Sequence, residues 1–179
     1  QSAQHQGHPG LEYHVTKDKS LIRTQFAKNM IRLGTMLGLK LNTVGMFTGK
    51  PGCITSTHID GTPEHAFTWR VAYYAKGEAA PLTWFKPVEA DKAVRLQKIE
   101  HTGDMRDVPP AGYTVVDATE AVHTELLDMH SAFVRTNHPH QLDMTDTTKP
   151  RLTITATFTP EISWEELNKR LDEIERNND

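Results

Sequence analysis

The segment RLTITATF, residues 151–158, alternates apolar and polar side chains along its length. Successive side chains of a β-strand point to opposite faces, so this pattern predicts a strand with one apolar face and one threonine face. Short apolar segments of similar texture, separated by Gly, Pro, Asp and Thr clusters, cover residues 41–47, 54–59, 66–75, 81–85, 94–100, 112–116, 122–127 and 131–136. Regularly spaced short strands predict a mainly β protein, built as a sandwich or barrel.

Helices are predicted on both sides of this strand-rich core, which spans residues 41–160. Apolar residues recur at helical spacing within residues 17–40, and the polar residues 1–16 before them predict a mobile N-terminus. A second helix is predicted over residues 163–176, where Ser163 and Glu166 form an S-x-x-E capping box. We expect residues 1–179 to form a single domain.

Composition excludes several classes of protein. The chain has 179 residues, 37% hydrophobic and 24% charged, which is typical of a globular domain. A net charge of −3 gives no general attraction to nucleic acid, and no apolar run approaches the ~20 residues that a membrane-spanning helix needs. The single cysteine cannot form a disulfide within the chain, which favours a cytoplasmic location. The oligomeric state is left open.

Two short motifs supply metal-ligand side chains. In Thr57-His58-Ile59-Asp60-Gly61, His58 and Asp60 lie two residues apart and point to the same side of a strand. Alone, this H-x-D pattern equally fits a surface turn at Asp60-Gly61. The second motif, Asn137-His138-Pro139-His140, offers a distant histidine. Two histidines and one carboxylate form a facial triad with open positions, as in non-haem Fe(II) oxygenases.

The distal histidine has three candidates from the sequence. His140 and His138 share the same strand parity, so alternation does not separate them. His123 is the third, because Arg135 follows it much as Arg151 follows His140. The spacing argues against His123, since no strand remains after Arg135 to close the fold before the His138–His140 motif. The residues alone leave His138 and His140 open.

Further polar side chains are predicted around this centre. Arg151 opens the last strand, where its guanidinium can bind a carboxylate with two hydrogen bonds and the Thr153 hydroxyl can add another. Tyr74 shares strand parity with Arg70. If both point inward, a buried Arg70 would need an anionic partner and could bind an acidic substrate. Otherwise Arg70 is solvated and Tyr74 is an ordinary core aromatic.

The order of these motifs resembles that of the 2-oxoglutarate/Fe(II)-dependent dioxygenase superfamily. The stretch AYYAKG, residues 72–77, followed by LTWF, residues 82–85, looks like the segment after the metal motif in prolyl-hydroxylase-type members. It lacks their paired glycines. The stretch RLTITATFTPEISW, residues 151–164, is similar to the end of aspartyl/asparaginyl β-hydroxylase-like proteins.

This resemblance implies a double-stranded β-helix, or jelly roll, and an activity. His58, Asp60 and His140 would bind Fe(II), and Arg151, aided by Thr153 and Tyr74, would hold 2-oxoglutarate. With O2 as the other cosubstrate, the enzyme would hydroxylate an unactivated C–H bond. Arg70 and His138 are weaker candidates for substrate contacts. The substrate would be an amino acid, a side chain of a peptide or protein, or a small natural-product precursor.

Two other functions fit the same residues. A cupin-like metalloenzyme would use the His138-Pro139-His140 pair and no 2-oxoglutarate. A non-catalytic module on the same fold would bind a metal or ligand without forming succinate.

Overall fold

The computed structural model describes residues 11–16, 24–62, 65–66, 68–87, 93–98, 112–128 and 131–177. The chain is mainly β. Its elements in order are β1 (Leu11–Thr16), α2 (Gln25–Met36), β2 (Lys40–Gly49), β3 (His58–Thr62), β4 (His65–Ala66), β5 (Trp69–Lys76), β6 (Ala80–Phe85), β7 (Ala93–Lys98), β8 (Gly112–Val116), β9 (Ala121–Leu127), β10 (Ser131–Arg135), β11 (His140–Leu142), β12 (Arg151–Thr159) and α3 (Trp164–Arg176).

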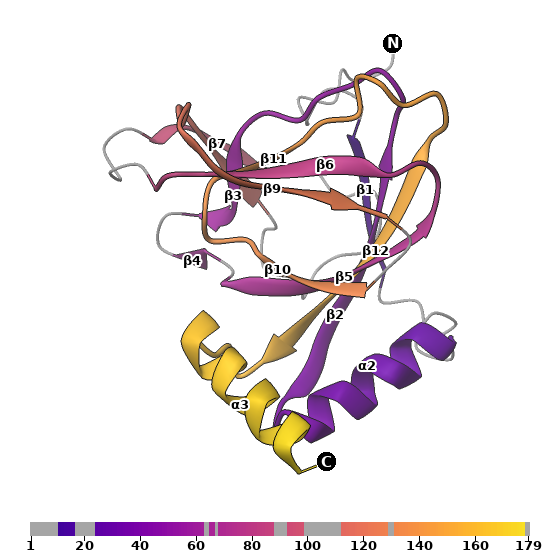
Figure 1. The fold of residues 1–179 in the computed structure, drawn as a ribbon, viewed down its shortest axis with the longest axis vertical. Helices are drawn as coiled ribbons and strands as arrows, with labels where there is room; N and C mark the ends of the chain where they lie inside the picture. The colour runs from indigo at the N-terminus through magenta and orange to yellow at the C-terminus, as the bar shows by residue number, and fades with distance from the viewer. Residues whose placement is uncertain are drawn as a thin grey trace.

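The strands form two antiparallel sheets (Figure 1). One sheet has the order β1-β2-β12-β5-β10, and the other has the order β7-β8-β3-β11-β6-β9, with β4 paired to β3. Leaving aside β1, β4, β7 and β8, the remaining strands can be counted one to eight along the chain. The first sheet then holds strands 1-8-3-6, and the second holds strands 2-7-4-5. Consecutive strands along the chain therefore mostly lie in opposite sheets.

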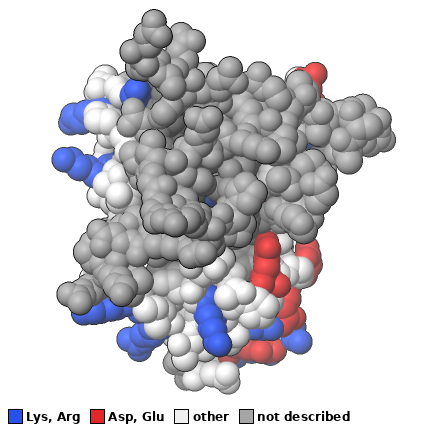
Figure 2. All heavy atoms as spheres, turned by 180° about the vertical axis from the view of Figure 1, so that it is seen from behind, with Lys and Arg blue, Asp and Glu red and all other residues white. Residues whose placement is uncertain are grey.

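Both helices lie against the outer face of the five-stranded sheet (Figure 1). The Thr24 side chain caps α2 by accepting from Ala27 N–H at 3.2 Å, and Ser163 caps α3 by accepting from Glu166 N–H at 3.1 Å. The second cap is the one that the S-x-x-E motif predicts. Their polar sides face solvent. In Figure 2 acidic side chains gather over α3 and basic ones toward α2.

The two faces of β12 separate core from cavity. Ala156 and Phe158 pack with Met30, Leu37 and Leu167 into the core beneath the helices. On the other face, residues of the opposite parity line a cavity between the sheets. The alternation read from residues 151–158 is therefore a division between a packing face and a cavity face.

Several boundaries differ from the sequence predictions. Residues 11–16 form β1, paired with β2, where a mobile terminus is predicted. The helix predicted over residues 17–40 is α2, which begins at Gln25 and ends at Met36 before Gly38 adopts a positive φ of 68°; residues 17–23 lie outside the described part. The strand predicted over residues 54–59 begins instead at His58, and the short β11 is missed.

The C-terminal helix agrees with its prediction, and β8 has the predicted bounds. Residues 88–92 and 99–111, which include the last two residues of the strand predicted over 94–100, lie outside the described residues. No helix in the part of the chain that the structure describes is long and apolar enough to cross a membrane.

Candidate functional site

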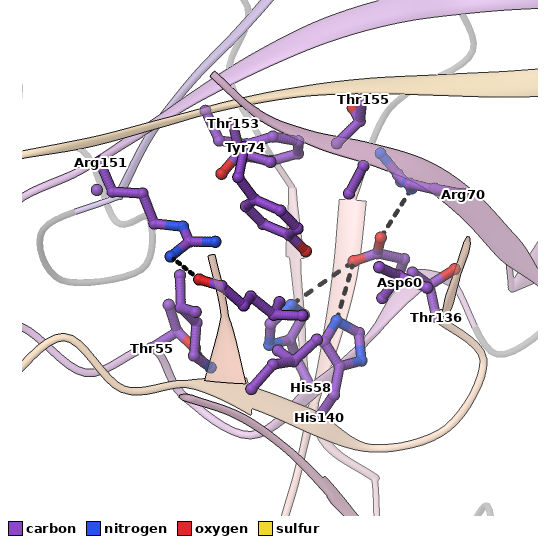
Figure 3. Close-up of a pocket in the computed structure, with 17 residues that line it drawn as sticks. Thr55, His58, Asp60, Arg70, Tyr74, Thr136, His140, Arg151, Thr153 and Thr155 are labelled. Carbon is purple, nitrogen blue, oxygen red and sulfur yellow. Dashed lines mark hydrogen bonds and ion pairs between the residues drawn. The ribbon is translucent and has the colours of Figure 1, made fainter. Parts of the chain in front are cut away.

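Two histidines and one aspartate meet at the base of the cavity between the sheets (Figure 3). His58 and Asp60 lie two residues apart on β3, so strand alternation points both side chains to the same face. His140 opens β11 and lies opposite His58 in the antiparallel register. One ligand atom from each residue lies within 4.8 Å of the others. Asp60 Oδ1 is 3.6 Å from His58 Nε2 and 4.0 Å from His140 Nε2.

Backbone carbonyls orient both imidazole rings. His58 Nδ1 is 2.7 Å from the Ser56 carbonyl oxygen, and His140 Nδ1 is 2.8 Å from the His138 carbonyl oxygen. A carbonyl only accepts, so Nδ1 is the donor in each contact, which leaves Nε2, on the side of Asp60, as the atom that could bind a metal. Metal-binding histidines use this arrangement. The rings are 8% and 6% exposed, and their centroids lie 4.3 Å apart.

The donor set fits a divalent transition metal. Three ligand residues on two neighbouring strands bring one ligand atom each within 4.8 Å of the others, and all three residues line the cavity. Two histidines and one carboxylate with open positions suit non-haem Fe(II). The prediction that His58, Asp60 and His140 converge agrees with the structure, which leaves the identity of any metal open.

The cavity has an apolar wall and an empty volume of about 710 Å³, counting the part open to solvent. The wall is formed by Ala72, Leu82, Leu127, Val134 and Leu142. Ala72, Leu82, Leu127 and Val134, together with Tyr74, belong to the smaller hydrophobic core between the sheets. A concave apolar wall with a few polar groups is typical of a small-molecule site.

Arg151 is the most deeply buried cation lining this cavity, at 2% exposure. Its Nη1 donates to the carbonyl oxygens of Glu78 at 3.0 Å and Leu127 at 2.7 Å. Its Nε and Nη2 have no hydrogen-bond partner among the described residues. Burying a guanidinium with unmet donors is costly unless an anion completes it. The cavity therefore offers a place for a carboxylate beside Arg151.

Tyr74 packs its ring on this guanidinium. The Arg151 Cζ lies 4.1 Å from the ring centroid, a cation–π distance. In the view of Figure 3 the ring lies between Arg151 and the histidine–aspartate group. Burial raises the pKa of Tyr74 to about 12, although Arg151 acts in the opposite direction. The hydroxyl therefore stays protonated at neutral pH and can donate a hydrogen bond into the cavity.

A tight turn holds Arg151 in place. Gly77 follows β5 with a φ of +118°, a conformation that side chains rarely adopt. A Cβ added there would lie 2.7 Å from Arg151 Cα, so the turn approaches the first residue of β12 only because position 77 has no side chain. Within the same turn, the Glu78 carboxylate accepts hydrogen bonds from the Thr148 N–H and hydroxyl, at 2.7 and 2.6 Å.

The other predicted residues divide between the cavity and the surface. Thr153 lines the cavity, as does Tyr74. Arg70 points inward as its parity with Tyr74 predicts, and its Nε lies 2.8 Å from Asp60 Oδ2. His138 does not line the cavity; its carbonyl orients His140. His123 is exposed on β9, and its side chain pairs with Glu125 at 3.4 Å.

Sequence reasoning missed three contributors to the site. Thr155 is 7% exposed and lines the cavity, and strand parity with Arg151 and Thr153 could have identified it. The carbonyl oxygens of Glu78 and Leu127 accept from Arg151. Backbone carbonyls leave no trace in a sequence, so no pattern could have revealed them.

Comparisons with known proteins add little. No family model matches the sequence, and no curated protein matches it. Among solved structures, the chain is similar to the polyketide cyclase RemF from Streptomyces resistomycificus, with 10% identity and a TM-score of 0.38 over 90% of this chain and 76% of that one. It is also similar to CapF with the inhibitor 3-isopropenyl-tropolone, with 10% identity and a TM-score of 0.29 over 66% of this chain and 30% of that one. With TM-scores this low, neither likeness bears on the function proposed below.

Proposed function

We propose that this protein is an Fe(II)/2-oxoglutarate-dependent oxygenase built on a jelly roll, which hydroxylates an amino acid or an amino-acid side chain. The observation that carries the proposal is one cavity holding two complementary halves of a site. One half is the converging His58, Asp60 and His140 group. The other is the buried Arg151, two of whose donors have no hydrogen-bond partner in the described part of the chain. A dicarboxylate with a metal-chelating keto acid at one end would satisfy both.

The strand order supports the fold assignment. Eight strands divide between two antiparallel sheets in the orders 1-8-3-6 and 2-7-4-5. A double-sheet jelly roll has eight strands wound in this alternating manner. The cavity then lies between the sheets, where such a fold can enclose a ligand.

Each polar side chain has a task in this proposal. His58, Asp60 and His140 would hold Fe(II), which when bound supplies the activation of O2 for C–H oxidation. Arg151 Nε and Nη2 would donate to the distal carboxylate of 2-oxoglutarate, and the neutral Tyr74 hydroxyl could add a third hydrogen bond. The apolar wall excludes water from the reacting end of the cavity.

The cupin-like alternative draws less support from the geometry. It relies on His138 and His140 as a ligand pair, yet the His138 side chain does not line the cavity. It also gives the unpaired donors of Arg151 no ligand. A non-catalytic module would need the same ligand set, so only a turnover measurement separates it from the oxygenase.

The test is an anaerobic titration of the Fe(II)-loaded protein with 2-oxoglutarate, followed by visible absorption. We expect a saturable charge-transfer band under anaerobic conditions. When O2 is then admitted, succinate should form, either with a substrate present or by turnover that is not coupled to hydroxylation. His58→Ala should abolish the band, whereas His123→Ala should keep it, because His123 lies on the exposed strand β9. Bound iron without a band would refute the use of 2-oxoglutarate. A band without succinate would favour the non-catalytic module.

A further inference from the structure

An ion pair links the two sheets directly at the proposed metal centre. Arg70 lies on β5 in one sheet and Asp60 on β3 in the other. Arg70 Nε is 2.8 Å from Asp60 Oδ2, and the two side chains are 10% and 16% exposed. Figure 3 shows Arg70 and the histidines on different sides of the Asp60 carboxylate.

The two carboxylate oxygens of Asp60 have different neighbours. Oδ1 is the oxygen near both Nε2 atoms, at 3.6 and 4.0 Å, while Oδ2 lies against the guanidinium. Both side chains are largely buried, so the opposite charges attract more strongly than they would in water. Asp60 is therefore oriented to offer one oxygen to a metal, and rotating it to offer both would break the contact with Arg70.

The number of oxygens offered matters for what else can bind. An octahedral ion with three protein ligand atoms keeps three open positions, and a fourth ligand atom would remove one. A two-oxygen chelator and O2 together need all three. We infer that Arg70 is a positioning residue that restricts Asp60 to one-oxygen ligation and so keeps the third position open; this rests on the metal-binding half of the proposed function.

The positive charge of Arg70 should affect metal binding and anion binding in opposite directions. A buried cation beside a metal ligand opposes the binding of a bare divalent ion, but it favours an anion that joins the ion afterwards. A residue that served only to retain the metal would not be a cation. Removing Arg70 should therefore affect the metal and the anion differently, whereas general damage to the site would weaken both.

The experiment uses Co(II) as the metal, oxalate to fill two of the open positions and azide to probe the third. Oxalate binds through two oxygens and has no distal end to reach Arg151. Co(II) affinity is measured by competition with a coloured chelator. Azide affinity is measured, with and without saturating oxalate, by the change in the Co(II) visible bands. The proteins are wild type, Arg70→Met, Arg70→Lys and the control Arg135→Met. Arg135 is a half-buried arginine that pairs with Glu165 away from the cavity.

We expect Arg70→Met to bind Co(II) within a few-fold of wild type. In the presence of oxalate, the loss of azide affinity in Arg70→Met should exceed the loss without oxalate by about tenfold or more, the size usual for groups that orient metal ligands. The measurement without oxalate accounts for the missing positive charge. Arg70→Lys, which keeps a cationic donor, should recover part of the azide affinity of the oxalate complex, and Arg135→Met should match wild type.

Three results would overturn the inference. If the azide affinity of Arg70→Met falls no more with oxalate than without it, Oδ2 is not being held away from the metal. Loss of Co(II) and oxalate binding together, with the far-ultraviolet circular dichroism intact, would make Arg70 a general support of the site. Failure of wild type itself to bind Co(II) would remove the metal site and the proposed function with it. If Arg70→Met does not fold, the comparison of Arg70→Lys with wild type decides. Lysine cannot reproduce the planar guanidinium contact, so it should weaken azide binding to the oxalate complex more than Co(II) binding.

Discussion

Replacing Arg151 by methionine removes the proposed anchor for a distal carboxylate while keeping a long side chain in the cavity. Its Nε and Nη2 are buried and have no hydrogen-bond partner among the described residues, so both could donate to the proposed ligand. Hydrogen bonds to a charged group each contribute about 1.5 kcal/mol at the lower end of their range. Two of them amount to about 3 kcal/mol, which corresponds to roughly hundredfold weaker binding.

The assay is the anaerobic titration with two keto acids. 2-Oxoglutarate carries the distal carboxylate, whereas 2-oxobutyrate has the same metal-chelating end and lacks it. We expect Arg151→Met to weaken the binding of 2-oxoglutarate about a hundredfold and to leave the binding of 2-oxobutyrate nearly unchanged. The effect of the protein substitution then depends on whether the ligand carries the distal carboxylate, which is the signature of a direct interaction. The comparison cancels any general disturbance of the metal centre.

Stability must be followed in the same variant. Arg151→Met leaves the carbonyl oxygens of Glu78 and Leu127 without their donor, at a cost of about 1–3 kcal/mol for each. Arg151→Lys is the second variant, because its ammonium can still reach a carbonyl but not present the planar pair of donors. An equal loss of affinity for both keto acids in a folded variant would refute the assignment of Arg151 to the distal carboxylate.

Three further predictions concern the surroundings of this residue. Gly77→Ala would place a Cβ 2.7 Å from Arg151 Cα at a φ of +118°, so urea unfolding should show a loss of about 1–3 kcal/mol, and an unchanged midpoint would contradict the close approach. Tyr74→Phe should weaken the binding of 2-oxoglutarate several-fold, since one hydroxyl contributes about 1 kcal/mol. Because the pKa of Tyr74 is about 12, ionisation of this hydroxyl should not change the 2-oxoglutarate affinity of wild type up to pH 10. The hydrogen bonds from Thr148 lower the pKa of Glu78 below its ordinary 4.5; the stability that they add is therefore present above pH 4.5 and lost as the pH falls further, and Glu78→Gln should remove that part of the unfolding profile.

Strand alternation accounts for what the sequence predicts well. It correctly places His58 and Asp60 on one face of a strand, and Arg151 and Thr153 on the cavity face of another. A period of two needs no knowledge of neighbouring strands, so it can be read from one segment alone. The capping box at Ser163 is local in the same sense.

Features that depend on pairing between distant segments could not be predicted. The partner of Arg70 is set by how the two sheets face each other, and neither strand encodes that. The strand at His140 spans only three residues, too few to show a period. Residues 11–16 form an edge strand whose only neighbour among the described strands is β2. A strand with one neighbour carries only a weak alternation in its own sequence, so this segment is not recognisable as a strand.

The division of β12 into two faces has a consequence for how the protein could be altered. Ala156 and Phe158 belong to the core beneath the helices, while Thr153 and Thr155 border the cavity one residue away on the same strand. Folding stability and ligand choice thus draw on different side chains of a shared backbone. Retargeting the cavity by exchanging the two threonines leaves the helix-facing core intact, which makes these positions natural starting points for a library of variants.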